Sequence, residues 1–531
     1  MKYNIKDTSL EKALANGCNI PFFAAKVLAS YDMDVIKDIL DYHQQGVVFN
    51  TMEQAIELID KHINNNAKIV IMGDYDCDGV LATSILVKAF KDKGVDVGYY
   101  IPNRIVDGYG LNQNIVQQFI DKDYDLIITV DNGINALDAV QLALDNGIDV
   151  LVSDHHAIEE DMQDNRAIYV HPAYSNLDYY ISGGVVAYYI AIALLNRDDS
   201  YLHALAAITL ISDVMPLEKG NRIFLRKALA NMQANDYLPI KSLATGFIDS
   251  GMIGTIIAPK INSLGRLPDL YNPNKLVRYF CSDNANEIKS FAKEIEACNN
   301  HRKDMTAQYF ASYSEVVPSN NFVMIEEENL HEGLIGLLAS RFANQYNCVC
   351  LVATQNGDTF KGSVRSIDGI NAYEVFKKHS ALFDKFGGHA QAMGLSYNKE
   401  NAKEINEKLS NDFKDIDISD KEYQVIDVKE DDLSIDNVKS LRYLEPFGNE
   451  FEAPLFLLKN VLVAQIKHLK GNIHHRISVL LDHKAVDVMV FNQSDLDIKV
   501  NDHVDMIVKL GVNEFYGKEK LNIIVEDYKI Q

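Results

Sequence analysis

Short apolar runs alternate with amphipathic stretches between residues 67 and 153. The apolar runs predict four strands, at 67–73, 95–102, 125–130 and 148–153. Apolar residues at helical spacing predict helices at 80–94 and 135–147, and each of these stretches ends in a glycine, a frequent helix stop. Because strands alternate with helices, the region is predicted to form a parallel, doubly wound sheet.

Helical patterns follow this region. Residues 186–211 and 222–248 are predicted to be mainly helical, and the polar stretch 284–313 is predicted to form a long helix that joins two domains. Strand, helix and strand patterns then follow at 321–328, 336–346 and 348–354. We therefore predict a second, smaller α/β domain that ends near residue 412.

An acidic stretch at 411–432 separates these domains from a C-terminal part that has mostly strand character. The strand patterns lie at 453–469, 474–482, 485–491, 502–515 and 520–530. Short strands at this density predict a small barrel of the OB type.

The composition narrows the class of protein. The chain has 531 residues, of which 47% are hydrophobic and 24% charged, and these values are typical of a globular protein. It contains no apolar run of membrane-spanning length, its first residues contain no apolar core of the signal-peptide type, and its six cysteines form no CxxC pair. We therefore expect a reduced, cytoplasmic protein without a membrane span.

The formal net charge is −24, which argues against a protein coated with basic residues for binding duplex DNA. This charge does not exclude a narrow basic groove on an acidic body. Part of the acidic excess is also explained if carboxylates bind metal ions.

The strongest local motif is GDYDCDG at 73–79, in which Asp74, Asp76 and Asp78 follow an apolar strand and precede a helix. Three carboxylates this close repel one another unless a cation lies among them, and ligands of an open α/β sheet gather at the carboxyl ends of strands. The same spacing opens the calcium loop of an EF-hand. That alternative is disfavoured, because the twelfth loop position is Ile85 instead of glutamate and because a strand precedes the motif.

Carboxylates and histidines also follow later predicted elements. Asp131 ends one strand, Asp154, His155 and His156 follow another, and Asp213 follows an apolar helix. A single aspartate at such a place is often only a helix N-cap, but its recurrence favours a shared site. Aspartate and histidine without cysteine suit Mn²⁺ or Mg²⁺ better than structural zinc, and two such cations about 4 Å apart can bridge a phosphate. The residues by themselves thus predict a two-metal phosphoesterase.

In their order and spacing, GDYDCDG, TVDNG, SDHH and SDVMPL resemble the four motifs of the DHH phosphoesterase superfamily. The resemblance implies that the metal ligands are Asp76, Asp78, Asp131, His155 and Asp213, with Asp74 as a further candidate in the same motif. It also implies that His156 contacts the scissile phosphate and that Asp154 supports the histidine pair.

Further segments resemble the RecJ-type nucleases of this superfamily. They are YIPNRIVDGYGLN (100–112), KINSLGRL (260–267), HEGLIGLLASRF (331–342), KGSVRSIDGIN (361–371), GGHAQAMG (387–394) and LEPFGNEFEAPLF (444–456). Ser263 and Met393 stand where alanine is usual in the family.

The RecJ resemblance implies a set of residues that bind nucleic acid or its phosphates: Arg104, Arg266, Arg302, Ser363, Arg365, Gly387, Gly388 and His389. Ser363 and Arg365 match the family's pocket for a 5′-terminal phosphate, and the planar fork of arginine suits a phosphate because it forms bidentate bonds. Taken singly, each arginine would more often belong to an ordinary surface ion pair.

Element patterns and resemblance together predict the domain plan. It comprises an N-terminal segment at 1–45 packed on the first domain, a doubly wound parallel-sheet DHH domain at 46–250, a helical connection at 251–315, a smaller α/β DHH-associated domain at 316–412 and an OB-type β-barrel at 413–531. Candidates for contact with a single strand in the barrel are His468, His474, His475, Arg476, Phe491 and Phe515, with core packing or solvation as the equal alternative. Relatives often carry a tryptophan near Phe515, whereas this chain has none.

The resemblance implies a metal-dependent 5′→3′ exonuclease that degrades single-stranded DNA to mononucleotides by two-metal hydrolysis, in DNA repair and recombination. The expected cations are Mn²⁺, which is preferred, or Mg²⁺. Single-stranded DNA, a single-strand-binding protein and a RecQ-like helicase are the partners expected by family analogy, and a monomer is expected.

Two alternatives stay open. The first is a DHH phosphodiesterase for short oligoribonucleotides or dinucleotides, which the C-terminal barrel disfavours. The second is an inactive DHH scaffold in a replication complex, which the full set of motif carboxylates disfavours.

Overall fold

The computed structural model describes residues 1–40, 46–159, 164–313, 320–416, 422–469, 473–491, 493, 495–515 and 518–531. Its chain divides into two compact units. The larger unit comprises residues 46–215 and 228–419, and the smaller unit comprises residues 1–45, 216–227 and 420–531.

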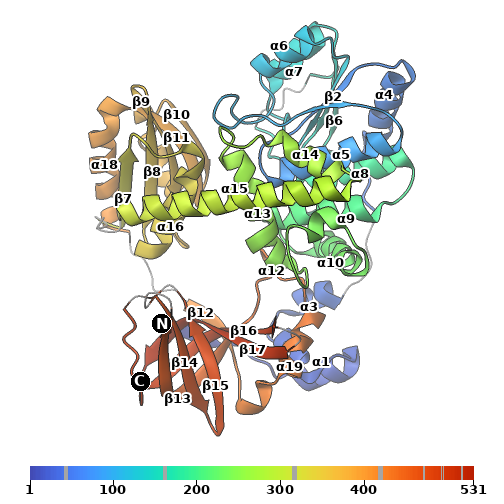
Figure 1. Cartoon of the computed structure of the whole chain (residues 1–531). Coiled ribbons are helices and arrows are strands. Elements are labelled where there is room, and N and C mark those ends of the chain that lie inside the picture. Colours follow the sequence, from blue (N-terminus) through green and yellow to red (C-terminus); the bar gives the residue numbers. More distant parts are fainter. Residues whose placement is uncertain are drawn as a thin grey trace. The chain divides into compact units, whose positions relative to one another are not determined.

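A five-stranded parallel sheet forms the first part of the larger unit (Figure 1). Its strand order is β3 (Gly98–Tyr100), β2 (Ile69–Met72), β4 (Leu126–Val130), β5 (Asp149–Ser153) and β6 (Ile168–Val170). All neighbouring strands pair in parallel. β2 and β4 are buried along their whole length, which is why they read as continuous apolar runs. The predicted parallel, doubly wound fold is confirmed, with β6 as an additional strand.

The direction of winding reverses between β2 and β4. α5 (Cys77–Asp92) leads from β2 to β3, whereas α6 (Gln113–Asp121) leads from β3 to β4 on the other side of β2. α6 and α7 (Leu137–Asp145) share a buried cluster with Val70 and Met72, and α5 and α8 (Gly183–Leu195) pack on the opposite face. Such a switch point leaves an opening outside the carboxyl ends of the two central strands, where α/β proteins bind ligands.

Further helices belong to this part of the unit: α4 (Met52–Asn64), α9 (Ser200–Ser212), α11 (Leu238–Lys241), α12 (Ser250–Met252), α13 (Ala258–Arg266), α14 (Asn274–Cys281) and α15 (Ala285–Ser312). α10 (Lys219–Ala234) begins in the smaller unit and ends in the larger one. The helical stretch predicted at 186–211 is divided into α8 and α9. Asn196 ends α8 in a left-handed conformation with φ 51°, and the Asp199 side chain caps α9. The stretch predicted at 222–248 is likewise divided, into α10 and α11.

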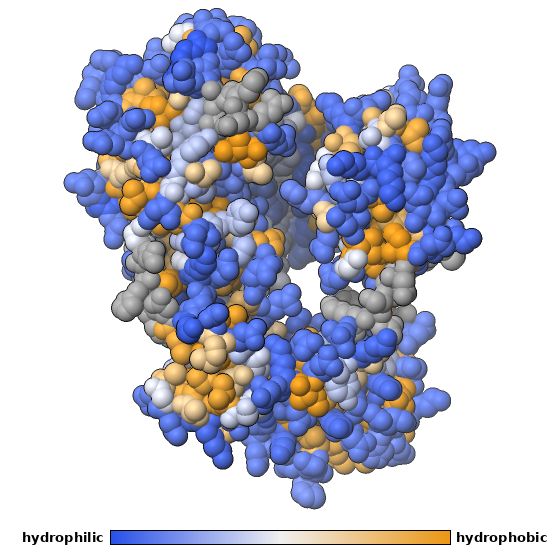
Figure 2. Space-filling model, turned by 180° about the vertical axis from the view of Figure 1, so that it is seen from behind, coloured by the Kyte–Doolittle hydropathy of each residue, from blue (hydrophilic) through white to orange (hydrophobic). Residues whose placement is uncertain are grey.

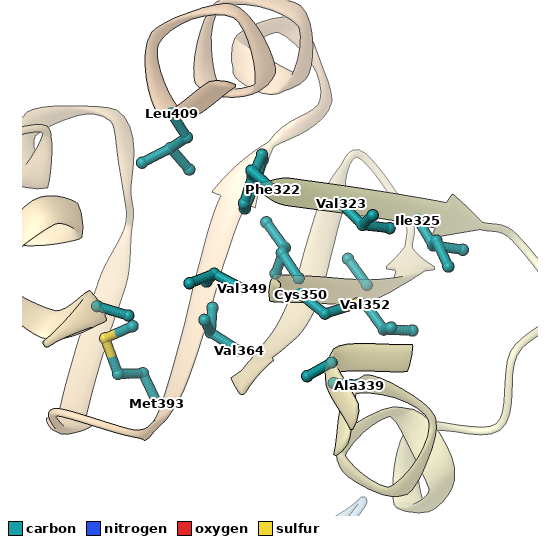
Figure 3. Close-up of a cluster of buried hydrophobic side chains, with 14 of the residues drawn as sticks. Phe322, Val323, Ile325, Ala339, Val349, Cys350, Val352, Val364, Met393 and Leu409 are labelled. Carbon is teal, nitrogen blue, oxygen red and sulfur yellow. The ribbon is translucent and has the colours of Figure 1, made fainter. Parts of the chain in front are cut away.

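A second five-stranded sheet follows, with the order β10 (Lys385–His389), β11 (Ala392–Asn398), β9 (Thr359–Arg365), β8 (Val349–Asn356) and β7 (Phe322–Glu327). β7 and β8 pair in parallel and the other neighbours pair antiparallel. α16 (Ile335–Tyr346), α17 (Ala372–Lys377) and α18 (Ala402–Lys414) accompany this sheet. Figure 3 shows its core, where Phe322, Cys350 and Leu409 lie among buried aliphatic side chains. The predicted second α/β domain is confirmed.

The smaller unit contains a closed barrel. β13 (Leu455–Leu469), β14 (His474–Leu481), β15 (Lys484–Val490), β17 (Lys518–Ile530) and β16 (His503–Phe515) follow one another, and β16 closes the ring by pairing with β13. Side chains of β14 alternate, because His475, Ile477 and Val479 are buried between residues that are not. The predicted OB-type barrel is confirmed.

The N-terminal segment belongs to this smaller unit. β1 (Lys2–Ile5) pairs in parallel with β12 (Glu422–Asp427), which in turn pairs with β13. A short strand must satisfy its backbone groups along a sheet edge, and β12 supplies that edge. Four helices complete the unit: α1 (Glu11–Cys18), α2 (Phe22–Leu28), α3 (Met33–Leu40) and α19 (Ile435–Ser440).

Polar residues prevail on the face of the protein that Figure 2 shows. Figure 2 shows one face, on which hydrophilic residues prevail and hydrophobic residues form separate patches. A bilayer-spanning helix is not found in the part of the chain that the structure describes, because no helix there is both long and apolar enough.

Candidate metal centre

The candidate ligands meet at the switch point of the first sheet. Asp74, Asp76 and Asp78 lie between β2 and the first turn of α5, and Asp131 follows β4 directly. His155 and His156 follow β5, and Asp213 is the residue at which α9 ends. Parallel strands present their carboxyl ends at one edge of the sheet, so residues far apart in the sequence converge there.

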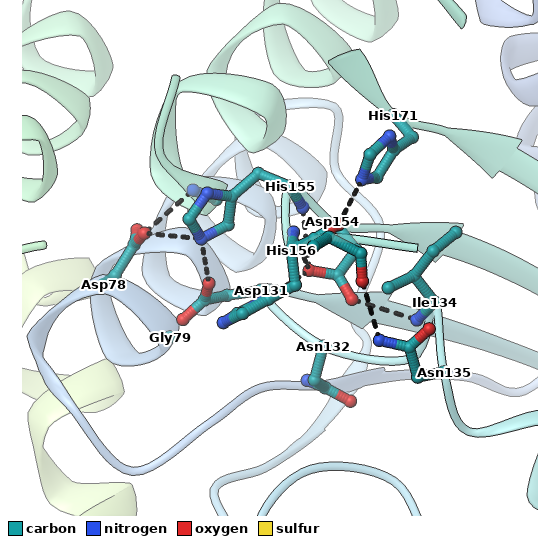
Figure 4. A network of polar contacts seen from close by, with 12 residues as sticks. Asp78, Gly79, Asp131, Asn132, Ile134, Asn135, Asp154, His155, His156 and His171 are labelled. Carbon is teal, nitrogen blue, oxygen red and sulfur yellow. Dashed lines mark hydrogen bonds and ion pairs between the residues drawn. The ribbon is translucent and has the colours of Figure 1, made fainter. Parts of the chain in front are cut away.

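His155 lies at the centre of this group. Figure 4 shows its ring beside the carboxylates of Asp78 and Asp131. Its Nε2 atom is 3.1 Å from Asp131 Oδ1, 3.5 Å from Asp213 Oδ2 and 3.8 Å from Asp78 Oδ2. We call Asp78, Asp131, His155 and Asp213 the acid–histidine cluster. His156 lies close enough to Asp131 and His155 to form a second group of three ligand atoms.

Asp78 is oriented by the start of α8. Its Oδ2 atom accepts a hydrogen bond of 2.8 Å from the Gly183 N–H, and its Oδ1 atom accepts one of 2.6 Å from the Gly184 N–H. A Cβ atom on Gly183 would lie 2.6 Å from Asp131 Cβ, so glycine is required where the helix meets the strand end. The two glycines thus hold one candidate ligand and make room for another.

The electrostatics of the cluster favour a cation. Burial, followed by the charges of Asp213 and Asp76, raises the pKa of Asp78 well above its usual value, and burial with Asp78 raises that of Asp131. Burial and Asp76 raise the pKa of Asp213 to about 7. Burial lowers the pKa of His155 to about 4, so this ring is neutral at pH 7 and able to bind a metal.

Two atoms of the cluster have no hydrogen-bond partner although both are buried. They are Asp131 Oδ1 and His155 Nε2, which face each other at 3.1 Å. Two ligands at right angles around a small divalent cation, with bonds of about 2.1 Å, are separated by roughly 3 Å. The donor atoms present therefore fit a shared cation of the Mn²⁺ or Mg²⁺ type.

Asp74 and Asp76 lie beside this cluster. Asp74 is buried and its Oδ1 atom also has no hydrogen-bond partner. Asp76 is half-buried and accepts a hydrogen bond of 3.1 Å from the Gly79 N–H, which caps α5. Neither residue belongs to the two groups of mutually close ligand atoms found among the described residues.

Asp154 holds the histidine pair. Its Oδ1 atom accepts hydrogen bonds from the N–H groups of His155 and His156 and lies 2.7 Å from His156 Nδ1. Its Oδ2 atom accepts a hydrogen bond from the Ile134 N–H (Figure 4). Burial opposes ionisation of both partners, but their hydrogen bond outweighs it. This hydrogen bond lowers the pKa of Asp154 and raises the pKa of His156 to about 9, so the pair is ionised at pH 7.

Four arginines lie near the same loop. α13 packs on the GDYDCDG segment, since Asn262 Oδ1 accepts a hydrogen bond from the Cys77 N–H and a Cβ on Gly265 would lie 2.0 Å from the Tyr75 carbonyl oxygen. Arg266 is therefore adjacent to the metal motif. Burial, followed by the charges of Arg104, Arg302 and Arg365, lowers the pKa of Arg266 to about 9.

None of these four arginines has a carboxylate within 4.0 Å in the part of the chain that the structure describes. Arg365 donates to Ser363 Oγ at 3.0 Å, Arg302 donates to Asn299 Oδ1, and Arg266 donates to the Gly333 carbonyl oxygen. The Arg104 guanidinium lies over the Tyr75 ring at 5.0 Å. The ordinary ion pairs that each arginine would form on a surface are thus not found, and a concentration of positive charge is left for an anion.

Comparison with known proteins assigns the chain in three parts. The DHH family, N-terminal domain, matches residues 68–212, the DHHA1 domain matches 316–415 and the RecJ OB domain matches 426–527. The chain is a RecJ-type member of the DHH family.

Two curated relatives carry the name single-stranded-DNA-specific exonuclease RecJ. The protein from Bacillus subtilis is 27% identical over 90% of this chain and 63% of its own length, so the chain spans less than two thirds of that relative. The protein from Salmonella typhimurium is 28% identical over 93% of this chain and 92% of its own length. The structure of RecJ from Thermus thermophilus in complex with Mn²⁺ matches 99% of this chain and 78% of that one, with a TM-score of 0.84 and 24% identity. This structural likeness shows the fold.

The glycine motif of the RecJ-type second domain is exposed. Gly387, Gly388 and His389 lie in β10, and Gly388 has φ +137°. A Cβ there would lie 2.5 Å from the Ala392 carbonyl oxygen, so the tight hairpin requires glycine. Among the described residues, none of the three belongs to the groups of close ligand atoms around His155.

The candidate residues of the RecJ-type barrel differ in exposure. His475 is buried, with its ring between His468 Nδ1 at 2.8 Å and the Gln493 carbonyl oxygen at 2.6 Å, and is a core residue. Phe491 is 46% exposed and packs edge-on against His474, while Arg476 lies 3.9 Å from Asp487. The side chain of Phe515 lies outside the described residues.

Sequence reasoning did not find three groups at this site. Gly183 and Gly184 hold Asp78, the buried His171 donates or accepts at the His156 carbonyl oxygen at 2.9 Å, and Tyr109 contacts His156. The GG pair ahead of an apolar helix gave a local signal, because a glycine pair there marks a close approach of backbones. Tyr109 lies within the segment 100–112 that resembles the RecJ family, but that resemblance gave the residue no role.

Proposed function

We propose that this protein is a 5′→3′ exonuclease that hydrolyses single-stranded DNA to mononucleotides. The observation that carries the proposal is the acid–histidine cluster, with its partnerless buried ligand atoms, beside four arginines that lack carboxylate partners. Paired cation ligands and free cationic side chains are what phosphodiester hydrolysis needs. The names of the two relatives above support exonuclease activity on single-stranded DNA, and the 5′→3′ polarity is proposed from the resemblance to the RecJ family.

We assign the metal ligands to Asp76, Asp78, Asp131, His155 and Asp213, with Asp74 as a further ligand. The cations are Mn²⁺, which is preferred, or Mg²⁺. When bound, two such cations would lower the pKa of a water and balance the charge of the phosphate. The protein holds the ligands in place through the Gly183 and Gly184 N–H groups and through Asp154.

The nucleic acid is held by cationic groups around this centre. His156 carries its proton on Nδ1 toward Asp154 and contacts the scissile phosphate. Arg104, Arg266 and Arg302 neutralise backbone phosphates, and Ser363 with Arg365 binds the 5′-terminal phosphate. Backbone amides at Gly387, Gly388 and His389 approach the same strand end.

The alternative is a DHH phosphodiesterase for dinucleotides or short oligoribonucleotides. A specific observation favours the longer substrate, since the match to the RecJ OB domain covers residues 426–527 and this part forms a closed barrel. An inactive scaffold is disfavoured because every motif carboxylate is present and four ligands meet at His155. A role in repair and recombination, with a single-strand-binding protein and a RecQ-like helicase, is proposed from the family alone.

The test is the release of nucleotides from strands labelled at one end. With Mn²⁺ present, we expect mononucleotide label from 5′-labelled single-stranded DNA at once, and from 3′-labelled DNA only after the strand is consumed. A blunt duplex of the same sequence is the control and should resist. Faster hydrolysis of a dinucleotide than of the long strand would support the alternative, and no Mn²⁺-dependent hydrolysis would contradict both.

A further inference from the structure

The loop between β3 and α6 brings a tyrosine to the metal centre. The Tyr109 side chain is 52% exposed, yet its hydroxyl donates a hydrogen bond of 3.1 Å to the Asp131 carbonyl oxygen. The Tyr109 hydroxyl oxygen also lies 3.2 Å from His156 Nε2 and 3.4 Å from His156 Nδ1. Tyr109 therefore contacts the backbone of one candidate ligand and the ring of the candidate phosphate-binding histidine.

Two neighbours hold the His156 ring. His156 Nδ1 lies 2.7 Å from Asp154 Oδ1, so the carboxylate holds one edge of the ring. The Asp131 carbonyl oxygen accepts only, so the Tyr109 hydroxyl hydrogen points there. The hydroxyl oxygen then faces the His156 ring, 3.2 Å from Nε2 and 3.4 Å from Nδ1.

The Tyr109 hydroxyl lies beside the His156 ring. Because it is almost equally far from both ring nitrogens, it lies beside the ring and not on the axis along which Nε2 points. The hydroxyl thus contacts the ring without occupying the axis of Nε2. Asp154 and Tyr109 together fix the imidazole from two sides.

A chain of ring contacts continues from His156 to a cationic side chain. The Tyr109 ring packs edge-on against His156 at 5.8 Å and against Tyr75 at 6.3 Å. The Arg104 guanidinium lies over the Tyr75 ring at 5.0 Å. Arg104 and Tyr109 belong to the same loop. The arginine proposed to bind the strand and the tyrosine that contacts His156 therefore share one backbone segment.

Both ends of this loop are braced. Asp107 Oδ2 accepts hydrogen bonds from the Asn103 N–H at 2.8 Å and from the Tyr100 hydroxyl at 2.9 Å. At the other end, the Leu111 N–H donates to Asn132 Oδ1 at 3.0 Å, and Asn132 is the residue after Asp131. The loop is thus anchored to the strand end that carries a candidate ligand.

We propose that Tyr109 is a positioning residue, whose hydroxyl holds the His156 imidazole in the orientation that meets the scissile phosphate. Through Tyr75, it ties that orientation to Arg104, so that binding of a strand and alignment of His156 are coupled. The inference rests on the nuclease activity proposed above. No family motif or match assigns this role to the tyrosine.

The experiment compares Tyr109→Phe with the full-length wild type on single-stranded DNA in Mn²⁺. Phenylalanine keeps the ring contacts and removes the hydroxyl. We expect kcat to fall about tenfold, while KM for the strand and the Mn²⁺ concentration for half-maximal rate stay within twofold. Tyr201→Phe is the matched control, because it removes a hydroxyl that donates to the Phe280 carbonyl oxygen at 2.8 Å and does not belong to this loop, and it should keep the wild-type kcat.

A double-mutant cycle tests whether the effect passes through His156. Adding Tyr109→Phe to His156→Ala should cost no further rate, because the group that the hydroxyl positions is already gone. Full additivity of the two losses would overturn the proposal, as would a wild-type kcat in Tyr109→Phe. Equal losses in Tyr201→Phe and Tyr109→Phe would also overturn it, by assigning both hydroxyls to the stability of the fold. A wild type without Mn²⁺-dependent hydrolysis would instead refute the nuclease activity itself.

Discussion

At the scale of single residues, the site is built from groups that are poorly satisfied within the protein. Asp131 Oδ1 and His155 Nε2 are buried without a hydrogen-bond partner, and burial with neighbouring charge raises the pKa of Asp78 and Asp131. Each unpaired buried polar group costs about 1–3 kcal/mol of stability. These residues therefore destabilise the metal-free protein and serve a ligand.

The first prediction concerns the candidate ligands. Asp131→Ala or Asp76→Ala should abolish hydrolysis and leave the fold intact, because the change removes a metal ligand but also relieves repulsion between carboxylates. The thermal midpoint in EDTA should not fall for Asp131→Ala, and Mn²⁺ should raise it less than in the wild type. Asp96→Ala, at an exposed aspartate, is the control. A residual rate above a tenth of wild type would contradict the assignment, because the activation free energy of hydrolysis would then have risen by less than roughly 1.4 kcal/mol.

The second prediction concerns the 5′ end. Arg365→Ala should erase a preference for 5′-phosphorylated over 5′-hydroxyl strands. The Arg365 guanidinium donates to Ser363 Oγ and has no carboxylate partner among the described residues, so it is available to bind the phosphate. Rates on both strands measure this. Lys361→Ala on the same strand is the control, since Lys361 pairs with Glu332 at 3.0 Å and should affect stability alone. Undiminished discrimination in Arg365→Ala would show that Arg365 only braces its loop.

At the scale of elements, the site depends on where α8 begins. The first N–H groups of a helix have no partner within it, and those of Gly183 and Gly184 bind Asp78. The absence of side chains there lets the helix approach Asp131. One helix start therefore sets the positions of ligands from β4 and from α5.

The third prediction follows from this contact. Gly183→Ala should raise the Mn²⁺ concentration needed for half-maximal rate by at least about tenfold, because the added Cβ, 2.6 Å from Asp131 Cβ, forces the helix and the strand end apart. Circular dichroism should show the wild-type helix content. Gly17→Ala in α1 is the control, since its added Cβ would meet no atom within 4 Å. Unchanged Mn²⁺ dependence in Gly183→Ala would mean that the backbone absorbs the methyl group without moving a ligand.

At the scale of the whole molecule, the barrel is not an independent C-terminal module. Residues 1–45 and 216–227 fold with it, and β1 completes its extended sheet beside β12. Deletion of residues 420–531 would therefore expose the N-terminal segment as well. The contribution of the barrel to strand binding is better measured by substitutions on its surface.

The fourth prediction concerns that contribution. Phe491→Ala should raise KM for a long strand by about fivefold or more and leave KM for a very short strand unchanged, because stacking of a base on an aromatic ring contributes roughly 1–3 kcal/mol. Phe491 is 46% exposed and thus accessible to a base. Val500→Ala, at a valine of similar exposure, is the control. An equal effect on both strand lengths would assign Phe491 a structural role.

The sequence determined those features whose signal is local. Continuous apolar runs marked β2, β4 and β5, because strands buried on both faces contain little else. The carboxylates and histidines at their ends marked the metal centre, and the three domain types and the RecJ-type membership were also predicted. The domain limits and the roles of individual site residues stay predictions.

Only the tertiary structure decided which distant segments meet. Hydrophobic periodicity reports that one face of an element is buried, but it does not name the surface that buries it. For that reason the sequence did not place β1 beside β12, bring the Gly183 and Gly184 amides to Asp78, or bring the Tyr109 hydroxyl to His156. Each of these contacts joins parts of the chain that are far apart in sequence and is fixed by packing of the completed fold. The sequence determined the chemical groups of this protein, and the fold decided their partners.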